Sequence, residues 1–170
     1  MLLVLCIDLD DDLGRKTGIE TPVIGRDAVV DAAVALASND PEDSDVNVLF
    51  EGVHIYDDIT DEPVEVAAVT GVDGSDVAAN RAVGEEVDTV LASLAASEDV
   101  RALIVTDGAQ DESVVPVIRS RVRIDASAAS SSARPRTSNR CTTPSSRCST
   151  TRRPAAQFWS RLAYSCSSTR

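Results

Sequence analysis

Short runs of apolar residues recur along the first part of the chain, and each run has the length of a β-strand. Leu2–Ile7 is continuously apolar and ends at Asp8, a pattern typical of a strand that is buried on both faces. The same reasoning predicts strands at Val64–Thr70 and Arg101–Thr106, and the beginning of a further strand at Val122–Asp125.

The segments between these strands mostly follow helical spacing. Arg26–Ser38 carries apolar residues at positions i, i+3, i+4 and i+7, which predicts one buried helix face. Asp45–Asp58 fits both a helix and a strand; we favour a helix, because Asp43 and Ser44 can cap its first turn. A long helix is predicted from about Ser75 to Leu94.

Two further segments are predicted from residues that break or cap regular secondary structure. The stretch from Asp10 to Gly25 contains three other breakers, namely Gly14, Gly18 and Pro22, and it is therefore predicted to be a loop. A short helix follows the third strand, with Ser113 as its expected cap and Pro116 in its first turn, where a missing N–H is harmless.

Alternating strands and helices favour the α/β class. The pattern predicts a Rossmann-like parallel sheet of about four strands with helices on both faces. The domain is expected to span residues 1–125, and a disordered tail is expected at 126–170.

Charge separates these two segments sharply. Residues 1–125 hold all 28 acidic residues and eight basic ones, a formal charge of −20, whereas residues 126–170 hold eight basic residues and no acidic ones. A charge of −20 repels itself in dilute salt and is screened at about 1 M salt, where the Debye length is about 3 Å. This composition favours a halophilic archaeal cytoplasm; an acidic protein of an ordinary cell is the alternative. The same charge opposes nucleic-acid binding by residues 1–125.

The tail has a different composition. Ser and Thr make up 18 of its 45 residues, and it contains no Val, Ile or Gly. Three interpretations stay open: a disordered basic tail, an arm that binds nucleic acid or a partner, and translation of GC-rich codons out of frame. We favour the frameshift, because the change falls inside a predicted strand, directly after Asp125. Sequencing the DNA across this point tests it.

Several separated motifs resemble one known family. They are Asp8–Lys16, Pro22–Arg26, Asp73–Asp76 and Thr106–Glu112. Together they resemble the archaeal family catalogued as domain of unknown function 373, described as predicted integral membrane proteins. The resemblance implies a cytoplasmic α/β domain followed by membrane helices. No stretch of this chain approaches the roughly 18 apolar residues needed to span a bilayer, so as written it is expected to be cytoplasmic.

Acidic residues follow each predicted strand, where parallel sheets bind ligands. They are Asp8, Asp10, Asp11 and Asp12, then Asp73 and Asp76, then Asp107, Asp111 and Glu112. Carboxylate oxygens suit Mg²⁺, and the predicted metal ligands are Asp8, Asp10, Asp107 and Asp111. Asp residues placed at turns and helix caps by chance are the alternative.

Three more residues are candidates for ligand binding. Arg15 and Lys16, the only lysine of the chain, could meet a phosphate. Ser75 opens a helix whose free N–H groups could hold an anion; a plain turn and helix cap is the favoured alternative at this position. Asp8 and Asp10 are also the candidate catalytic pair, since Asp8-Leu9-Asp10 is similar to the first motif of haloacid dehalogenase-like phosphatases. No Gly-Thr follows this motif, which departs from that family.

Three functions follow from these observations. The leading hypothesis is a cytoplasmic, ligand-sensing domain of a haloarchaeal membrane protein family. The second is a Mg²⁺-dependent phosphoryl-transfer enzyme that uses Asp8 and Asp10. The third is a truncated product without function, if the reading frame is lost.

Overall fold

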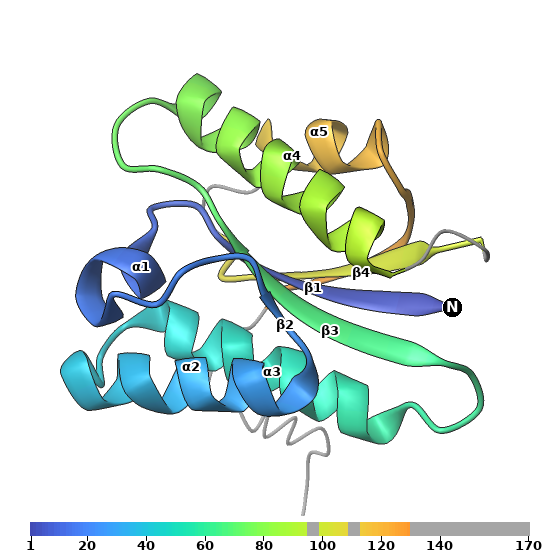
Figure 1. Ribbon diagram of the computed structural model, residues 1–170, viewed down its shortest axis with the longest axis horizontal. Helices are drawn as coiled ribbons and strands as arrows, with labels where there is room; N and C mark the ends of the chain where they lie inside the picture. The colour runs from blue at the N-terminus through green and yellow to red at the C-terminus, as the bar shows by residue number, and fades with distance from the viewer. Residues whose placement is uncertain (95–98, 109–112, 130–170) are drawn as a thin grey trace, which may run out of the picture. The chain divides into compact units, whose positions relative to one another are not determined.

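The computed structural model describes residues 1–94, 99–108 and 113–129 (Figure 1). These residues belong to one compact unit, Met1–Arg134. Its elements are β1 (Leu2–Asp8), α1 (Asp12–Thr17), β2 (Val23–Ile24), α2 (Arg26–Asn39), α3 (Ser44–Asp58), β3 (Val64–Thr70), α4 (Asp76–Ser93), β4 (Arg101–Thr106), α5 (Val115–Arg119) and β5 (Arg123–Ala129).

One sheet of five strands has the order β2-β3-β1-β4-β5. β1 pairs in parallel with β3 and with β4, and β4 pairs in parallel with β5. β2 pairs with β3 in antiparallel orientation. The α/β class and the four predicted parallel strands are confirmed, and the sheet has five strands where about four were expected. The missed strand, β2, has two residues, too few to produce an apolar pattern.

The sheet buries side chains on both faces, as its continuous apolar runs require. Along β1, Val4 and Cys6 join the core beneath α2 and α3, while Leu3, Leu5 and Ile7 join the core beneath α4 and α5. Figure 1 shows these two helix pairs on opposite sides of the sheet.

The choice of a helix after Asp43 is confirmed by α3. The Asp43 side chain accepts a hydrogen bond from the N–H of Asp45 at 2.9 Å. Ser75 caps α4 in the same way and accepts from the N–H of Ala78. The expected cap at Ser113 is wrong, because the residue at the N-cap of α5 is Val114.

The predicted loop from Asp10 to Gly25 contains a helix as well as β2, which corrects the sequence reading. α1 is only six residues long, and Gly18 ends it in the left-handed conformation, with φ of 75°. Glycine adopts this conformation without steric cost. A helix of this length carries too few apolar positions to be seen as a periodic pattern.

Strand β5 extends beyond the expected domain end at residue 125. Its pairing with β4 skips Asp125 and continues from Ala126 to Ala129, opposite Leu103 to Thr106. Residues 130–170 lie outside the described residues, so the disordered-tail and frameshift interpretations stay predictions. Among the described helices, none is long and apolar enough to cross a membrane.

The chain connections diverge between β1 and β4. From β1 the chain passes through α2 and α3 to β3 on one side, and it then crosses through α4 to β4 on the other side. In open sheets of this type, ligands bind beyond the carboxyl ends of the strands where such a divergence occurs.

Candidate functional site

The three acidic segments predicted from the sequence follow strands that end at one edge of the sheet. β1 is parallel to β3, with Asp8 level with Thr70, and it is also parallel to β4. Asp73 follows β3 and Asp107 follows β4 in the chain. Both residues therefore come after strands that end at the same edge of the sheet as Asp8. Asp111 and Glu112 lie outside the described residues.

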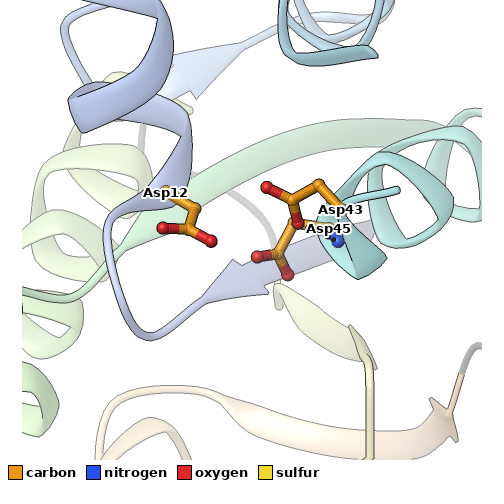
Figure 2. A group of neighbouring side chains, drawn as sticks. All are labelled: Asp12, Asp43 and Asp45. Atoms are coloured by element: carbon orange, nitrogen blue, oxygen red, sulfur yellow. Dashed lines mark hydrogen bonds between the residues drawn. The ribbon is translucent and has the colours of Figure 1, made fainter. Parts of the chain in front are cut away.

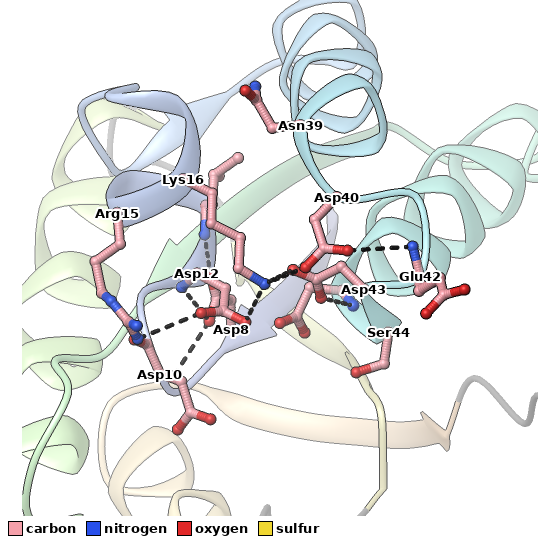
Figure 3. A network of polar contacts seen from close by, with 12 residues as sticks. Asp8, Asp10, Asp12, Arg15, Lys16, Asn39, Asp40, Glu42, Asp43 and Ser44 are labelled. Atoms are coloured by element: carbon pink, nitrogen blue, oxygen red, sulfur yellow. Dashed lines mark hydrogen bonds and ion pairs between the residues drawn. The ribbon is translucent and has the colours of Figure 1, made fainter.

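Asp8 organises the turn between β1 and α1. One carboxylate oxygen accepts from the N–H groups of Asp10 and Asp12, at 3.1 and 3.2 Å, and the other accepts from the N–H of Leu13 at 2.8 Å (Figure 3). Burial raises the pKa of Asp8 to about 6, and the backbone donors oppose this rise. Asp8 is only 5% exposed, and both of its carboxylate oxygens accept hydrogen bonds from backbone N–H groups of the turn.

Lys16 lies within an acidic network on the α2 and α3 side. Its Nζ donates to Asp12, Asp40 and Asp43 at 2.9, 2.8 and 2.7 Å (Figure 3). Hydrogen bonds to these three carboxylates raise the pKa of Lys16, and Lys16 lowers the pKa of Asp40. Lys16 is therefore an internal counterion, which differs from the predicted phosphate contact.

Three carboxylates of this region lie close enough to share a cation. Oxygens of Asp12, Asp43 and Asp45 lie within 4.8 Å of one another (Figure 2). Burial, followed by the charges of Asp8, Asp43, Asp107 and Asp12, raises the pKa of Asp45 to about 8. The ammonium of Lys16 already contacts two of the three carboxylates, so this set does not fit a divalent cation while Lys16 is charged.

This grouping differs from the metal set predicted from the sequence. Only Asp12 follows a strand, whereas Asp43 and Asp45 come from the beginning of α3. The single local signal was the capping role of Asp43, which gave no reason to place it beside Asp12. Asp107 approaches the same helix end, where its Oδ2 accepts a hydrogen bond from the hydroxyl of Ser44 at 3.2 Å.

A cavity of about 490 Å³ opens at the same edge of the sheet. The β1–α1 turn, the β3–α4 loop and the first turns of α4 supply most of its walls. The lining residues are Leu9, Asp10, Arg15, Val72, Asp73, Gly74, Ser75, Asp76, Ala79, Asn80 and Ser113. Two of the three predicted ligand-binding residues, Arg15 and Ser75, are thus brought together, and Lys16 is not among them.

The two loops that form the cavity are fixed to each other at Gly71. Its N–H donates to the carbonyl oxygen of Asp8 at 2.7 Å. A Cβ atom at Gly71 would lie 2.1 Å from the carbonyl oxygen of Leu9. Only glycine allows the β3–α4 loop to approach the β1–α1 turn this closely.

Glu86 of α4 holds the end of β3 from the other side. Its carboxylate accepts from the N–H of Thr70 at 2.7 Å and from the hydroxyl of Thr21 at 2.6 Å. Burial raises the pKa of Glu86, and these hydrogen bonds oppose the rise. No local sequence pattern predicts this contact, because Thr21 and Glu86 are 65 positions apart.

Among the described residues that line the cavity, Arg15 is the only positively charged one. Its Nη1 donates to the carbonyl oxygen of Asp10 at 3.1 Å and to Asp12 at 3.3 Å, and it lies 4.0 Å from a carboxylate oxygen of Asp73. The described lining combines one guanidinium, three carboxylates and neutral hydrogen-bonding groups. Such a lining can bind and orient a polar molecule.

Two archaeal proteins are similar to the chain. An uncharacterized protein of Archaeoglobus fulgidus is 50% identical over 125 residues, which are 72% of this chain and 36% of that protein. The uncharacterized protein MJ1032 of Methanocaldococcus jannaschii is 37% identical over 122 residues, which are 70% of this chain and 32% of that protein. The match thus spans about a third of the length of these relatives.

No solved structure matches the chain significantly. The model of the family described as Domain of unknown function (DUF373) matches residues 1–128, three quarters of the chain, and the chain therefore belongs to this family.

Proposed function

We propose that this domain binds a small polar ligand in the cavity at the carboxyl edge of the sheet, without transforming it. The observation that carries the proposal is the cavity of about 490 Å³ that joins Arg15 and Ser75. Ligand pockets in proteins commonly have volumes of about 300–1,000 Å³ and hold a few convergent polar groups.

The position of the cavity supports the same proposal. Its lining includes residues that follow β1 and β3, and Ser113, which follows β4. The connections diverge between β1 and β4, which is where open sheets bind ligands. Gly71 and Glu86 fix the loops around the cavity, so little ordering of the backbone would be needed on binding.

Phosphoryl transfer is the second candidate, and the geometry of Asp8 weighs against it. A nucleophilic carboxylate needs an oxygen that can reach the phosphorus atom. Both oxygens of Asp8 accept backbone N–H groups within the β1–α1 turn. Asp10 lines the cavity, but without a free Asp8 the resemblance to the phosphatase motif supplies no nucleophile.

We further propose that the domain senses this ligand on behalf of a longer protein. The match covers 36% and 32% of the two relatives, so about two thirds of each lies outside the domain. A cytoplasmic domain of a membrane protein adapted to high salt fits the acidic composition. A product without function, caused by a frameshift, is the competing proposal, and it predicts no specific ligand.

Ligand binding is tested on the 170-residue chain by a thermal-shift screen of polar metabolites, repeated in dilute and in molar KCl. A ligand that raises the melting temperature is then titrated by calorimetry. Arg15→Ala is expected to weaken binding about tenfold, a loss of about 1.4 kcal/mol. Arg81→Ala is the matched control, because Arg81 is an exposed residue of α4 whose ion pair with a described residue is the one with Glu85.

Three results would overturn the proposal. The first is a screen that finds no ligand, and the second is equal weakening of binding by Arg15→Ala and Arg81→Ala. The third is hydrolysis of p-nitrophenyl phosphate that requires Mg²⁺ and disappears in a folded Asp8→Asn variant, which would favour the phosphoryl-transfer candidate.

A further inference from the structure

We propose that the ligand of this cavity is an organic ammonium compound. The inference rests on the proposed function, since it names the chemical class of ligand for the same site. It is argued from the cavity and from the balance of charge on its walls, where three carboxylates face one guanidinium.

Two of these carboxylates have no side-chain partner among the described residues. No hydrogen bond or ion pair joins the carboxylate of Asp10 or of Asp76 to another residue that the structure describes. Asp73 lies 4.0 Å from Nη1 of Arg15, at the limit of an ion pair. The walls therefore present unbalanced negative charge to a space that the described residues leave open, and a positively charged ligand would balance it.

The beginning of α4 supplies the main opposing effect. A helix N-terminus carries a partial positive charge of about half a unit, and α4 is 18 residues long. Asp76 stands in the first turn of α4 and offsets this charge. Asp10 and Asp73 then remain opposite Arg15 alone, so the balance stays negative and a bare anion is disfavoured.

The size and the lining of the cavity favour an organic cation over a metal ion. A water molecule occupies about 30 Å³ in the liquid, so a single ion would leave most of a cavity of about 490 Å³ to water. Leu9, Val72 and Ala79 provide apolar surface for carbon atoms. An ammonium compound places N–H donors on the carboxylates and carbon atoms on this surface.

The neutral groups of the cavity allow further contacts with the same ligand. The hydroxyl of Ser113 donates to Oδ1 of Asn80 at 3.3 Å, which leaves the amide nitrogen of Asn80 able to donate. The hydrogen bonds of Arg15 to described residues use Nη1, so its other N–H groups can receive a carboxylate or hydroxyl group. A ligand that carries both an ammonium group and such an acceptor can contact the carboxylates, the guanidinium, the neutral polar groups and the apolar residues of the lining.

The test is calorimetric titration of the 170-residue chain with spermidine and with L-lysine at constant ionic strength. Inorganic phosphate, glycerol and MgCl₂ are titrated in the same buffer. At least one of the two amines is expected to bind saturably at one site. Asp10→Asn and Asp76→Asn should each weaken this binding about tenfold, and Asp31→Asn should leave it unchanged. Asp31 is an exposed residue of α2, so its substitution makes the same change of charge away from the cavity.

Three outcomes would overturn the inference. If Asp31→Asn weakens binding as much as Asp76→Asn, the amines respond only to the general acidity of the surface. If neither amine binds while phosphate or glycerol binds and Arg15→Ala removes that binding, the ligand class is wrong and the proposed function stands. If neither amine binds and the metabolite screen also finds no ligand, both proposals fail.

Discussion

The ammonium nitrogen of Lys16 lies 2.7 Å from Oδ2 of Asp43, whose side chain is only 2% exposed. Lys16 comes from the short helix α1, and Asp43 caps the beginning of α3. This ion pair therefore joins two elements that lie 27 positions apart. The ion pair balances the charge of the buried Asp43 carboxylate. Residues 1–125 contain only eight basic residues against 28 acidic ones, so few other cations could do this.

The first prediction concerns stability. Lys16→Met keeps most of the length of the side chain but leaves Asp12, Asp40 and Asp43 without their shared cation. Because removal of one partner strands a buried charge, we expect a loss of about 2–3 kcal/mol in the free energy of unfolding. Urea denaturation in dilute buffer measures it. Arg81→Met removes an exposed i,i+4 pair and should cost less than about 0.5 kcal/mol.

The second prediction concerns divalent cations. In the parent chain the Lys16 ammonium contacts Asp12 and Asp43, so 10 mM Mg²⁺ should not raise the melting temperature beyond the effect of NaCl at equal ionic strength. In Lys16→Met, the oxygens of Asp12, Asp43 and Asp45 become available to the cation, and Mg²⁺ should restore about 1 kcal/mol or more. Stronger stabilisation of the parent than of the variant would show that Lys16 is not the counterion.

The third prediction concerns pH. Burial and neighbouring acids raise the pKa of Asp45 to about 8, whereas its pKa in the unfolded chain is about 3.9. The folded state therefore binds this proton more tightly, so the contribution of Asp45 to stability is present below about pH 4 and is lost as the pH rises towards 8.

Asp45→Asn should remove this dependence and should be more stable than the parent at pH 8 by about 1–3 kcal/mol. Denaturation curves at pH 5, 6.5 and 8 measure the difference, and Asp31→Asn is the control for the loss of one exposed charge. A difference between parent and Asp45→Asn that does not grow with pH would contradict the assignment.

The fourth prediction concerns the β1–α1 turn. Asp8→Asn replaces one carboxylate oxygen by an NH₂ group, which cannot accept a backbone N–H. Because Asp8 accepts from three such groups, the substitution should lower stability by about 1–3 kcal/mol. Thermal unfolding followed by circular dichroism detects this loss, and no change in the midpoint would argue against a structural role for Asp8.

The fifth prediction compares two glycines inside helices. A Cβ at Gly52 of α3 would lie 2.1 Å from Sγ of Cys6 in the sheet, whereas a Cβ at Gly84 of α4 would lie 2.7 Å from the flexible end of Arg121. Gly52→Ala should therefore cost about 1–3 kcal/mol through overpacking, while Gly84→Ala should be neutral or stabilising by up to about 1 kcal/mol.

A double-mutant cycle checks the cause. In a Cys6→Ala background the sulfur is absent, so Gly52→Ala should become less costly. If Gly52→Ala lowers the free energy of unfolding equally in both backgrounds, Sγ of Cys6 does not limit the approach of α3 to β1.

Much of the fold was predictable from local patterns. Val64–Thr70 was predicted as a strand with its observed bounds, because a short run rich in apolar and β-branched residues is typical of a buried strand. Asp43 and Ser75 were recognised as helix caps, because a cap depends on atoms within three residues of itself. β2 and α1 were missed, because two and six residues are too short to show a period.

The candidate site was predictable only in part. The sequence placed acidic residues after three strands, and parallel pairing brings the ends of those strands to one edge. It also selected Arg15 and Ser75, which line one cavity. It could not assign roles within this group. The contacts of Lys16 with three carboxylates and the backbone hydrogen bonds of Asp8 were not predicted.

Local patterns in the amino-acid sequence are sufficient to predict where the strands and most helices form, because periodicity and capping act between residues that are neighbours along the chain. The folded arrangement brings Lys16 to Asp40 and Asp43 and Glu86 to Thr21. It also makes the loops after β1 and β3 enclose a cavity. Charge interactions and desolvation depend on distances through space, and those distances exist only once strand order and helix packing are set.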